Sequence, residues 1–172
     1  MSEAAAPFTT VLPSRAETIA FAAFLGGLLR PGDLVLLEGG LGAGKTTFAQ
    51  GLARGLGLSA AVKSPTYTLV HEYRAGEPGR TGLGHLDLYR IPAGRDLGDL
   101  GLDDLLERAP VVVEWGARLF TPAVDALLLT LEAPEGDAPL ESRRVTVEGR
   151  GPRGGALAAA AIDRLRAAAA SS

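Results

Sequence analysis

Residues 39–46 read Gly-Gly-Leu-Gly-Ala-Gly-Lys-Thr and fit the phosphate-binding pattern G-x-x-x-x-G-K-[ST]. In such a loop the backbone N–H groups face the phosphates, and the following helix adds the positive end of its dipole. We expect Lys45 to bind the β- and γ-phosphates, Thr46 to give its hydroxyl to Mg²⁺ and Thr47 to bond the α-phosphate. The alternative is a glycine-rich helix entry with no ligand. However, the chain has only two lysines, so chance rarely produces this pattern.

Two carboxylates are candidates to hold the metal or the attacking water. Glu114 follows the apolar run Val111–Val113, and ligands of open α/β sheets lie at the carboxyl ends of strands. Asp87 lies between two leucines, where a carboxylate needs a charged partner or a metal. For both residues the alternative is an ordinary ion pair at a strand end, with Arg90 as the rival partner of Asp87.

Other residues in the sequence give weaker indications. The segment 64–68, Ser-Pro-Thr-Tyr-Thr, follows the phosphate-loop helix, where some P-loop proteins carry a loop that senses the γ-phosphate, although Pro65 could simply shape a turn. His71 and His85 lack a second histidine at metal-binding spacing, so we expect them to be structural. Trp115 could lie in the core, on a partner surface or near the nucleotide.

The elements that must position these residues follow from hydrophobic periodicity and turn residues. Helices are expected from the capping box at Ser14 to about Leu29, and over residues 45–56, 102–109 and 156–170. Strands are expected at residues 8–12, 34–37, 67–73, 83–89, 111–113, 126–131 and 144–148. The segments 75–82 and 133–142 have the composition of mobile hairpin connections.

This alternation of strands and helices predicts an α/β fold, a three-layer P-loop NTPase-like domain. We expect a mixed, mainly parallel central sheet with antiparallel additional strands. With 172 residues and no repeat, the chain is expected to form a single P-loop ATPase domain over residues 1–172.

Composition excludes several classes of protein. The chain is 47% apolar and 22% charged with a net charge of −3, which excludes a disordered protein and a general polyanion binder. It has no cysteine, and so no disulfide or thiolate site. No apolar run approaches a membrane span, and the first residues lack a signal peptide, so we expect a cytoplasmic protein without membrane contact.

The charge distribution and the guanine-recognition pattern bear on the ligand. No Asn/Thr-Lys-x-Asp string that could read guanine is present, so ATP is the expected nucleotide. The acidic run over residues 96–107 is expected to be a solvated helix face or a partner contact. The arginines of the C-terminal stretch could meet RNA or an acidic partner, but no aromatic residues are interleaved with them.

In combination, the motifs resemble the TsaE (YjeE) family of bacterial ATPases, which is required for threonylcarbamoyladenosine modification of tRNA. The similarity rests on four segments that occur in the family's order and spacing. They are residues 41–47 (Leu-Gly-Ala-Gly-Lys-Thr-Thr), 62–70 (Val-Lys-Ser-Pro-Thr-Tyr-Thr-Leu-Val), 85–90 (His-Leu-Asp-Leu-Tyr-Arg) and 113–115 (Val-Glu-Trp). Gly116–Ala117 departs from the family, in which a proline or an acid often stands there.

The resemblance implies roles for particular residues. Thr46 and Glu114 would bind Mg²⁺, and Asp87 would support the metal or the water. Thr66 would belong to a nucleotide-sensing loop, and Thr18 would lie near the nucleotide. The expected catalytic residues are Lys45, Asp87 and Glu114, and the expected metal-binding residues are Thr46, Glu114 and Asp87. The expected nucleotide-binding residues are Thr18, Leu41, Gly42, Ala43, Gly44, Lys45, Thr46, Thr47 and Thr66.

The resemblance also implies a function and partners. TsaE proteins act with TsaD and TsaB, which transfer a threonylcarbamoyl group to adenosine 37 of tRNAs that read codons beginning with A. ATP hydrolysis would reset that complex, so tRNA is met through the complex. Hydrolysis should be weak until a partner completes the site, with Arg90 and Arg118 as candidate arginine fingers within the chain. The alternatives are a small-molecule P-loop kinase and a nucleotide-gated regulatory binding module.

Overall fold

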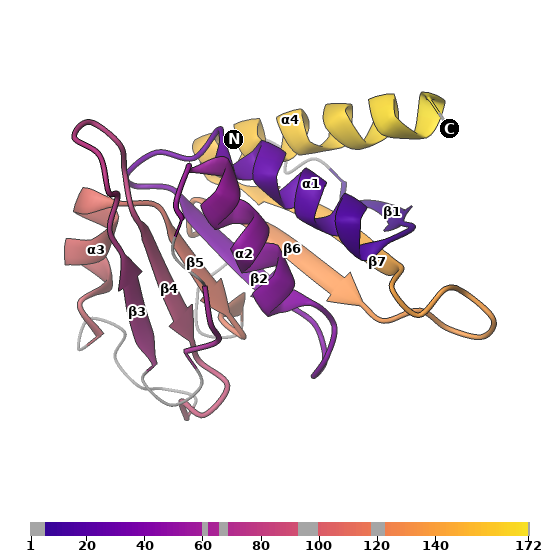
Figure 1. Cartoon of the computed structure of the whole chain (residues 1–172), viewed down its shortest axis with the longest axis horizontal. Coiled ribbons are helices and arrows are strands. Elements are labelled where there is room, and N and C mark those ends of the chain that lie inside the picture. Colours follow the sequence, from indigo (N-terminus) through magenta and orange to yellow (C-terminus); the bar gives the residue numbers. More distant parts are fainter. Residues whose placement is uncertain (1–5, 60–61, 66–68, 93–99, 118–122, 172) are drawn as a thin grey trace.

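The computed structural model describes residues 6–59, 62–65, 69–92, 100–117 and 123–171. These ranges form four helices and a sheet of seven strands in the order β1-β7-β6-β2-β5-β4-β3 (Figure 1). The strands are β1 Phe8–Leu12, β2 Leu34–Glu38, β3 Val70–Tyr73, β4 Leu83–Asp87, β5 Val111–Glu114, β6 Ala126–Glu132 and β7 Arg143–Arg150. The helices are α1 Arg15–Gly26, α2 Lys45–Gly55, α3 Leu102–Arg108 and α4 Gly151–Ala170.

The centre of the sheet is parallel. Strands β4, β5, β2 and β6 run in one direction. At one edge β3 is antiparallel to β4, and at the other β7 is antiparallel to β6 and β1 is antiparallel to β7. The register aligns Glu114 with Leu37 of β2 and with Asp87 of β4. The carboxyl ends of these three strands therefore lie level at one edge of the sheet, and both candidate carboxylates lie there.

Helices cover both faces of the sheet (Figure 1). Helices α1, α2 and α4 share one buried apolar cluster with alternate residues of the strands, among them Val35, Leu37 and Val112. Helix α3 packs on the opposite face against the other set, which includes Leu36 and Val113. The central strands are buried on both faces, which explains their continuous apolar sequence. The expected α/β fold with a mixed, mainly parallel sheet is confirmed.

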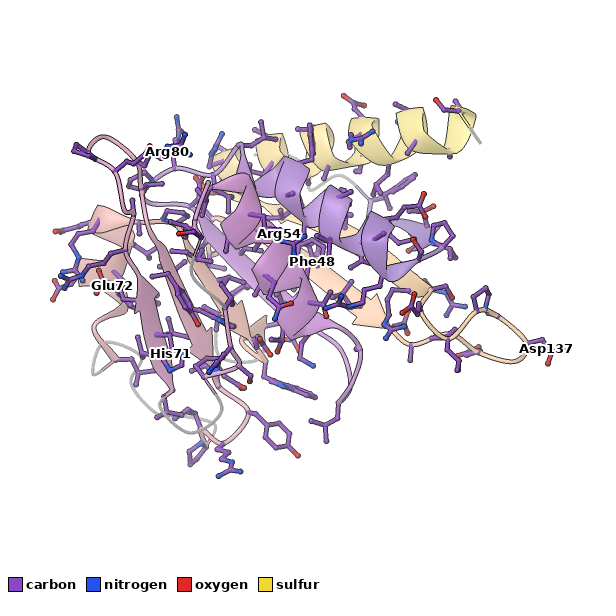
Figure 2. The ribbon with its side chains drawn as sticks, viewed as in Figure 1. Phe48, Arg54, His71, Glu72, Arg80 and Asp137 are labelled. Atoms are coloured by element: carbon purple, nitrogen blue, oxygen red, sulfur yellow. The ribbon has the colours of Figure 1, made fainter. Side chains whose placement is uncertain are left out.

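Close packing of α1 on α2 fixes the helix that starts at the phosphate loop. A Cβ atom added at Gly55 would lie 2.0 Å from the carbonyl oxygen of Ala23, so only glycine allows this approach. Phe48 of α2, labelled in Figure 2, is fully buried. Its ring meets that of Phe21 edge-on, with 5.8 Å between the centroids. Helix α2 is therefore anchored both to α1 and to the sheet.

Several boundaries differ from those that the sequence predicts. Helix α1 ends at Gly26 instead of Leu29, because the chain tightens there into a turn in which Leu28 N donates to Leu25 O. Leu69 has a φ of 63°, so it does not belong to an extended strand, and Tyr67 lies outside the described residues. Helix α4 begins five residues earlier than expected, at Gly151.

In the part of the chain that the structure describes, no helix combines the length and the apolar character that crossing a bilayer requires.

Candidate functional site

The glycine loop connects the end of β2 to the start of α2. Gly39 has a φ of 139°, and a Cβ atom there would lie 2.1 Å from the carbonyl oxygen of Leu131, so a side chain is excluded. Gly44 is left-handed with a φ of 102°, and its carbonyl accepts the first helical hydrogen bond, from Phe48 N at 2.8 Å. The loop therefore wraps back on itself, and the amino terminus of α2 opens toward the edge of the sheet.

Lys45 is buried within this loop, with 5% of its surface exposed. Its Nζ donates to the carbonyl oxygens of Gly39 and Gly40 at 2.7 and 2.9 Å, and lies 4.1 Å from the centroid of the Trp115 ring. Burial lowers the pKa of Lys45 below its usual value. The carboxylates of Glu114, Asp87 and Glu38 raise it and offset this only in part. The ammonium group is thus placed next to the loop by carbonyls, a ring face and nearby negative charge.

Two buried carboxylates lie opposite the loop. Glu114 is 3% exposed and Asp87 is 5% exposed. Thr46 Oγ1 donates to Glu114 Oε1 at 3.3 Å, which links the first turn of α2 to the end of β5. Asp87 accepts from Tyr89 N at 3.0 Å and from Ser64 Oγ at 3.4 Å. The loop residues and both carboxylates therefore meet at one edge of the sheet.

The turn after β5 shapes the wall of the site. Trp115 has a φ of 60°, which is strained for a bulky residue. Its backbone N–H donates to Leu37 O at 3.0 Å. Glu38 accepts from Ala117 N and so fixes the end of the same turn. The Trp115 ring lies 5.1 Å from that of Tyr89, between centroids. Of the three positions that the sequence left open for Trp115, the structure places it beside the phosphate loop.

Arg143 at the start of β7 also contacts the phosphate loop. Its Nε donates to Ala43 O at 2.8 Å and its Nη2 to Gly42 O at 3.4 Å. The neighbouring Arg144 pairs instead with Glu132 at 3.8 Å and does not line the cleft. Sequence reasoning missed Arg143, because 100 residues separate it from the loop and no local pattern distinguishes it from the other C-terminal arginines.

His85, which the sequence analysis expects to be structural, contacts one of the two carboxylates. It is completely buried in β4, and its Nε2 lies 2.8 Å from Glu114 Oε1. The spacing His-x-Asp on a buried strand indicates only that His85 shares a face with Asp87, because residues two apart on a strand lie on one face. The ring therefore lies on the same side of the sheet as Asp87.

A cleft of about 550 Å³ lies between the phosphate loop and the two carboxylates. Of the expected site residues, the cleft is lined by Thr18, Leu41, Gly42, Gly44, Lys45, Thr46, Thr47, Asp87 and Glu114. Ala43 does not line it and instead presents its carbonyl to Arg143. Arg90 lines the cleft, whereas Thr66 and Arg118 lie outside the described residues.

Helix α1 contributes Thr18 to this cleft. The helix begins at the expected capping residue, Ser14, whose hydroxyl accepts from Glu17 N at 3.2 Å. Thr18 is 2% exposed, and its Oγ1 donates to Ser14 O at 3.2 Å. One turn of helix therefore holds the Thr18 hydroxyl at the wall of the cleft.

The donor set fits a magnesium ion better than a softer metal. Thr46 offers a hydroxyl, and Glu114 and Asp87 offer carboxylates, and hard oxygen ligands are those that Mg²⁺ prefers. Among the described residues, no group of three or more His, Asp or Glu side chains is arranged as a metal cage. A phosphate-loop magnesium does not need such a cage, because nucleotide phosphates and water supply its other ligands.

The glycine loop joins a buried strand to a helix, and it faces carboxylates at the ends of neighbouring parallel strands. This arrangement defines a P-loop NTPase-like nucleotide-binding domain. Residues 12–144 match the model of the family "Threonylcarbamoyl adenosine biosynthesis protein TsaE". The chain therefore belongs to the TsaE family, and the resemblance seen in its motifs is confirmed.

Relatives and a solved structure agree with this assignment. A Streptomyces coelicolor protein named tRNA threonylcarbamoyladenosine biosynthesis protein TsaE is 44% identical over 131 residues, which cover 75% of this chain and 88% of the relative. A Bacillus subtilis protein of the same name is 45% identical over 100 residues, covering 58% and 60%. The crystal structure of Bacillus subtilis YdiB superposes with a TM-score of 0.72 at 27% identity, covering 95% of this chain and 99% of YdiB.

Proposed function

We propose that this chain is an Mg²⁺-dependent ATPase subunit that acts with TsaD and TsaB in threonylcarbamoylation of adenosine 37 in tRNAs reading codons that begin with A. The names of its relatives support the tRNA modification. The observation that carries the ATPase proposal is the meeting of Lys45 and Thr46 with the buried carboxylates of Glu114 and Asp87 in one cleft.

Each residue has a distinct part in the proposed chemistry. Backbone N–H groups of the loop and the amino terminus of α2 bind the phosphates, and Lys45 contributes a positive charge to the β- and γ-phosphates. Thr46 and Glu114 hold Mg²⁺, with Asp87 supporting the metal or orienting the water. When bound, Mg²⁺ neutralises charge that develops on the phosphate oxygens.

ATP is the proposed nucleotide, since the sequence lacks the string that reads guanine. Besides the phosphate loop, the cleft is lined by Arg15 and Thr18 of α1, by Glu141 just before β7 and by Arg143 at the start of β7. Adenine can be accepted by shape and backbone contacts, which a cleft of about 550 Å³ allows. We place the base in the part of the cleft that lies away from the two carboxylates.

Exposed apolar side chains around the mouth of the cleft support a partner-completed site. Leu41 is 78% exposed and Tyr89 is 45% exposed, and both line the cleft. Leu140 is 87% exposed and directly precedes Glu141, which also lines it. TsaD or TsaB would cover these side chains, and the covered site would hydrolyse ATP faster than the open one.

Reconstitution with TsaD, TsaB and tRNA tests the proposal. Lys45→Ala should abolish nucleotide binding measured by calorimetry, because it removes the cation from the phosphate site. Glu114→Gln and Asp87→Asn should still bind nucleotide but fail to support repeated rounds of tRNA modification. Normal modification by either acid variant would remove that residue from the proposed site.

The same assay separates the two alternatives. A small-molecule kinase would leave a phosphorylated acceptor, which mass spectrometry of the products would detect. A nucleotide-gated binding module would support repeated turnover when a hydrolysis-deficient variant such as Glu114→Gln binds ATP. Release of inorganic phosphate that depends on TsaD and TsaB, with no phosphorylated acceptor, is the result expected of the ATPase subunit.

A further inference from the structure

A buried histidine contacts the side chain of Glu114. His85 Nε2 lies 2.8 Å from Glu114 Oε1, whereas the other contact of this oxygen, with Thr46 Oγ1, is longer at 3.3 Å. His85 is 0% exposed. We propose that His85 is a positioning residue that fixes the orientation of Glu114 for Mg²⁺. This proposal rests on the metal-binding role of Glu114 in the proposed function.

The sheet register explains how the ring reaches the carboxylate. His85 of β4 is aligned with Val112 of β5, and Asp87 is aligned with Glu114. Because residues two apart on a strand share a face, His85 and Glu114 lie on the same face and are offset by two positions. The imidazole spans that offset, and a shorter side chain at position 85 would not reach Oε1.

The second ring nitrogen shows that the contact with Glu114 decides where the ring lies. Nδ1 of His85 is buried and has no hydrogen-bond partner among the residues that the structure describes. An unpartnered buried polar atom is costly, and an apolar side chain in this position would avoid that cost. Nε2 is the ring nitrogen that faces the carboxylate, and its N–H would donate to Glu114 Oε1. Such outer contacts orient metal-binding carboxylates.

The neighbourhood of Glu114 explains why it needs to be held. The negative charge of Glu114 lies close enough to Lys45 to raise the pKa of its ammonium group. Burial has the larger effect and lowers that pKa. If the Glu114 carboxylate could rotate freely, it would be attracted to the Lys45 ammonium. Glu114 would then no longer be directed at Mg²⁺, nor Lys45 at the phosphates. By retaining Oε1, His85 keeps Glu114 directed at the position that Thr46 also faces.

A pair of substitutions tests this role. His85→Leu removes the donor, while His85→Gln places an amide nitrogen close to the position of Nε2. Trp115 is the single tryptophan and lies beside Lys45, so its fluorescence should report ADP binding. With ADP present, His85→Leu should raise the Mg²⁺ concentration needed for half-saturation by about 10- to 100-fold. ADP affinity in EDTA should stay unchanged, and His85→Gln should restore most of the Mg²⁺ affinity.

His71→Leu is the matched control. His71 of β3, labelled in Figure 2, is the register partner of His85. Its ring contacts Tyr73 instead of Glu114. The His71→Leu variant should leave Mg²⁺ affinity unchanged. In a Glu114→Gln background, His85→Leu should cause no further loss of Mg²⁺ affinity, because the two residues act through one contact.

The outcomes are separable. Unchanged Mg²⁺ affinity in folded His85→Leu, or equal losses in the Leu and Gln variants, would overturn the positioning role. If His85→Leu does not fold, His85→Asn serves instead, since it is polar but too short to reach Glu114, and it should show the same loss. If Mg²⁺ has no effect on ADP binding by the unaltered chain, the proposed function fails and this inference fails with it.

Discussion

Arg143 bears on the phosphate site through the loop backbone. Its guanidinium donates to the carbonyls of Ala43 and Gly42, which directs those carbonyls toward β7. A peptide whose carbonyl is held on one side presents its neighbouring N–H groups to the other side. Arg143 therefore helps keep the loop in the shape that binds phosphate.

Replacing Arg143 should weaken nucleotide binding without unfolding the chain. Arg143→Ala removes two charge-assisted hydrogen bonds to the loop, together with those to Leu140 O and Ser142 O. We expect ADP affinity to fall by about 10-fold, equivalent to ~1.4 kcal/mol. Arg143→Lys should recover little, because an ammonium lacks the planar fork that reaches both carbonyls. Titration of ADP against Trp115 fluorescence measures this. Arg144→Ala is the control and should bind normally, and equal losses for both arginines would contradict the argument.

The phosphate loop and both carboxylates could be located from the sequence because each has a local signature. The loop has a fixed spacing, and Glu114 ends an apolar strand, so the rule that parallel strands meet at one edge places them together. The contacts of Arg143 and His85 could not be located in this way, since they join residues 100 and 29 positions apart. Such contacts depend on register and tertiary packing, which a single sequence does not encode locally.

At the scale of elements, the start of α4 shows the same limit. The sequence predicts a helix from Ala156, but the helix begins at Gly151 with Pro152 in its first turn. The Asp125 carboxylate accepts from Arg153 N at 3.2 Å and from Gly154 N at 2.6 Å, so a residue before β6 caps the helix. A cap that comes from a distant part of the chain leaves no signal in the helix sequence.

Two adjacent glycines of α4 should respond oppositely to alanine. A Cβ atom at Gly154 would lie 2.0 Å from the carbonyl oxygen of Ala126, whereas at Gly155 it would meet nothing within 4 Å. Gly154→Ala should therefore lower the free energy of unfolding by about 1–3 kcal/mol, because β6 or the helix must shift. Gly155→Ala should raise it by about 0.5–1 kcal/mol through helix propensity.

Denaturant unfolding followed by circular dichroism measures both variants. Because the two positions are neighbours in one helix, the comparison cancels the general effect of adding a methyl group to α4. A stable Gly154→Ala variant would show that the helix is not seated on β6 as closely as the structure indicates.

At the scale of the whole molecule, the cleft draws its lining from residues 15 to 143. Helix α1, the loop before α2, the ends of β4 and β5 and the start of β7 each contribute to it. Another contact joins α4 to the residue before β2. Arg153 of α4 donates to the buried Asp33 at 2.8 and 2.7 Å, and these hydrogen bonds raise the pKa of Arg153. The Arg153–Asp33 pair therefore lies at the amino ends of the parallel strands, whereas the cleft lies at their carboxyl ends.

The exposed leucine next to the cleft should matter only when partners are present. Leu140 is 87% exposed and its side chain is not part of the nucleotide site, so Leu140→Ser should leave ADP affinity and the basal ATPase rate unchanged. If TsaD or TsaB covers it, the loss of that apolar contact should lower the stimulated rate by about 5- to 10-fold at subsaturating partner, as for a buried interface residue. Leu28, 38% exposed after α1 and outside the cleft lining, provides the control Leu28→Ser, which should retain full stimulation. An apolar side chain that contacts a partner cannot be made polar without weakening that contact. Equal stimulation of both variants would therefore place the partner surface elsewhere on the molecule.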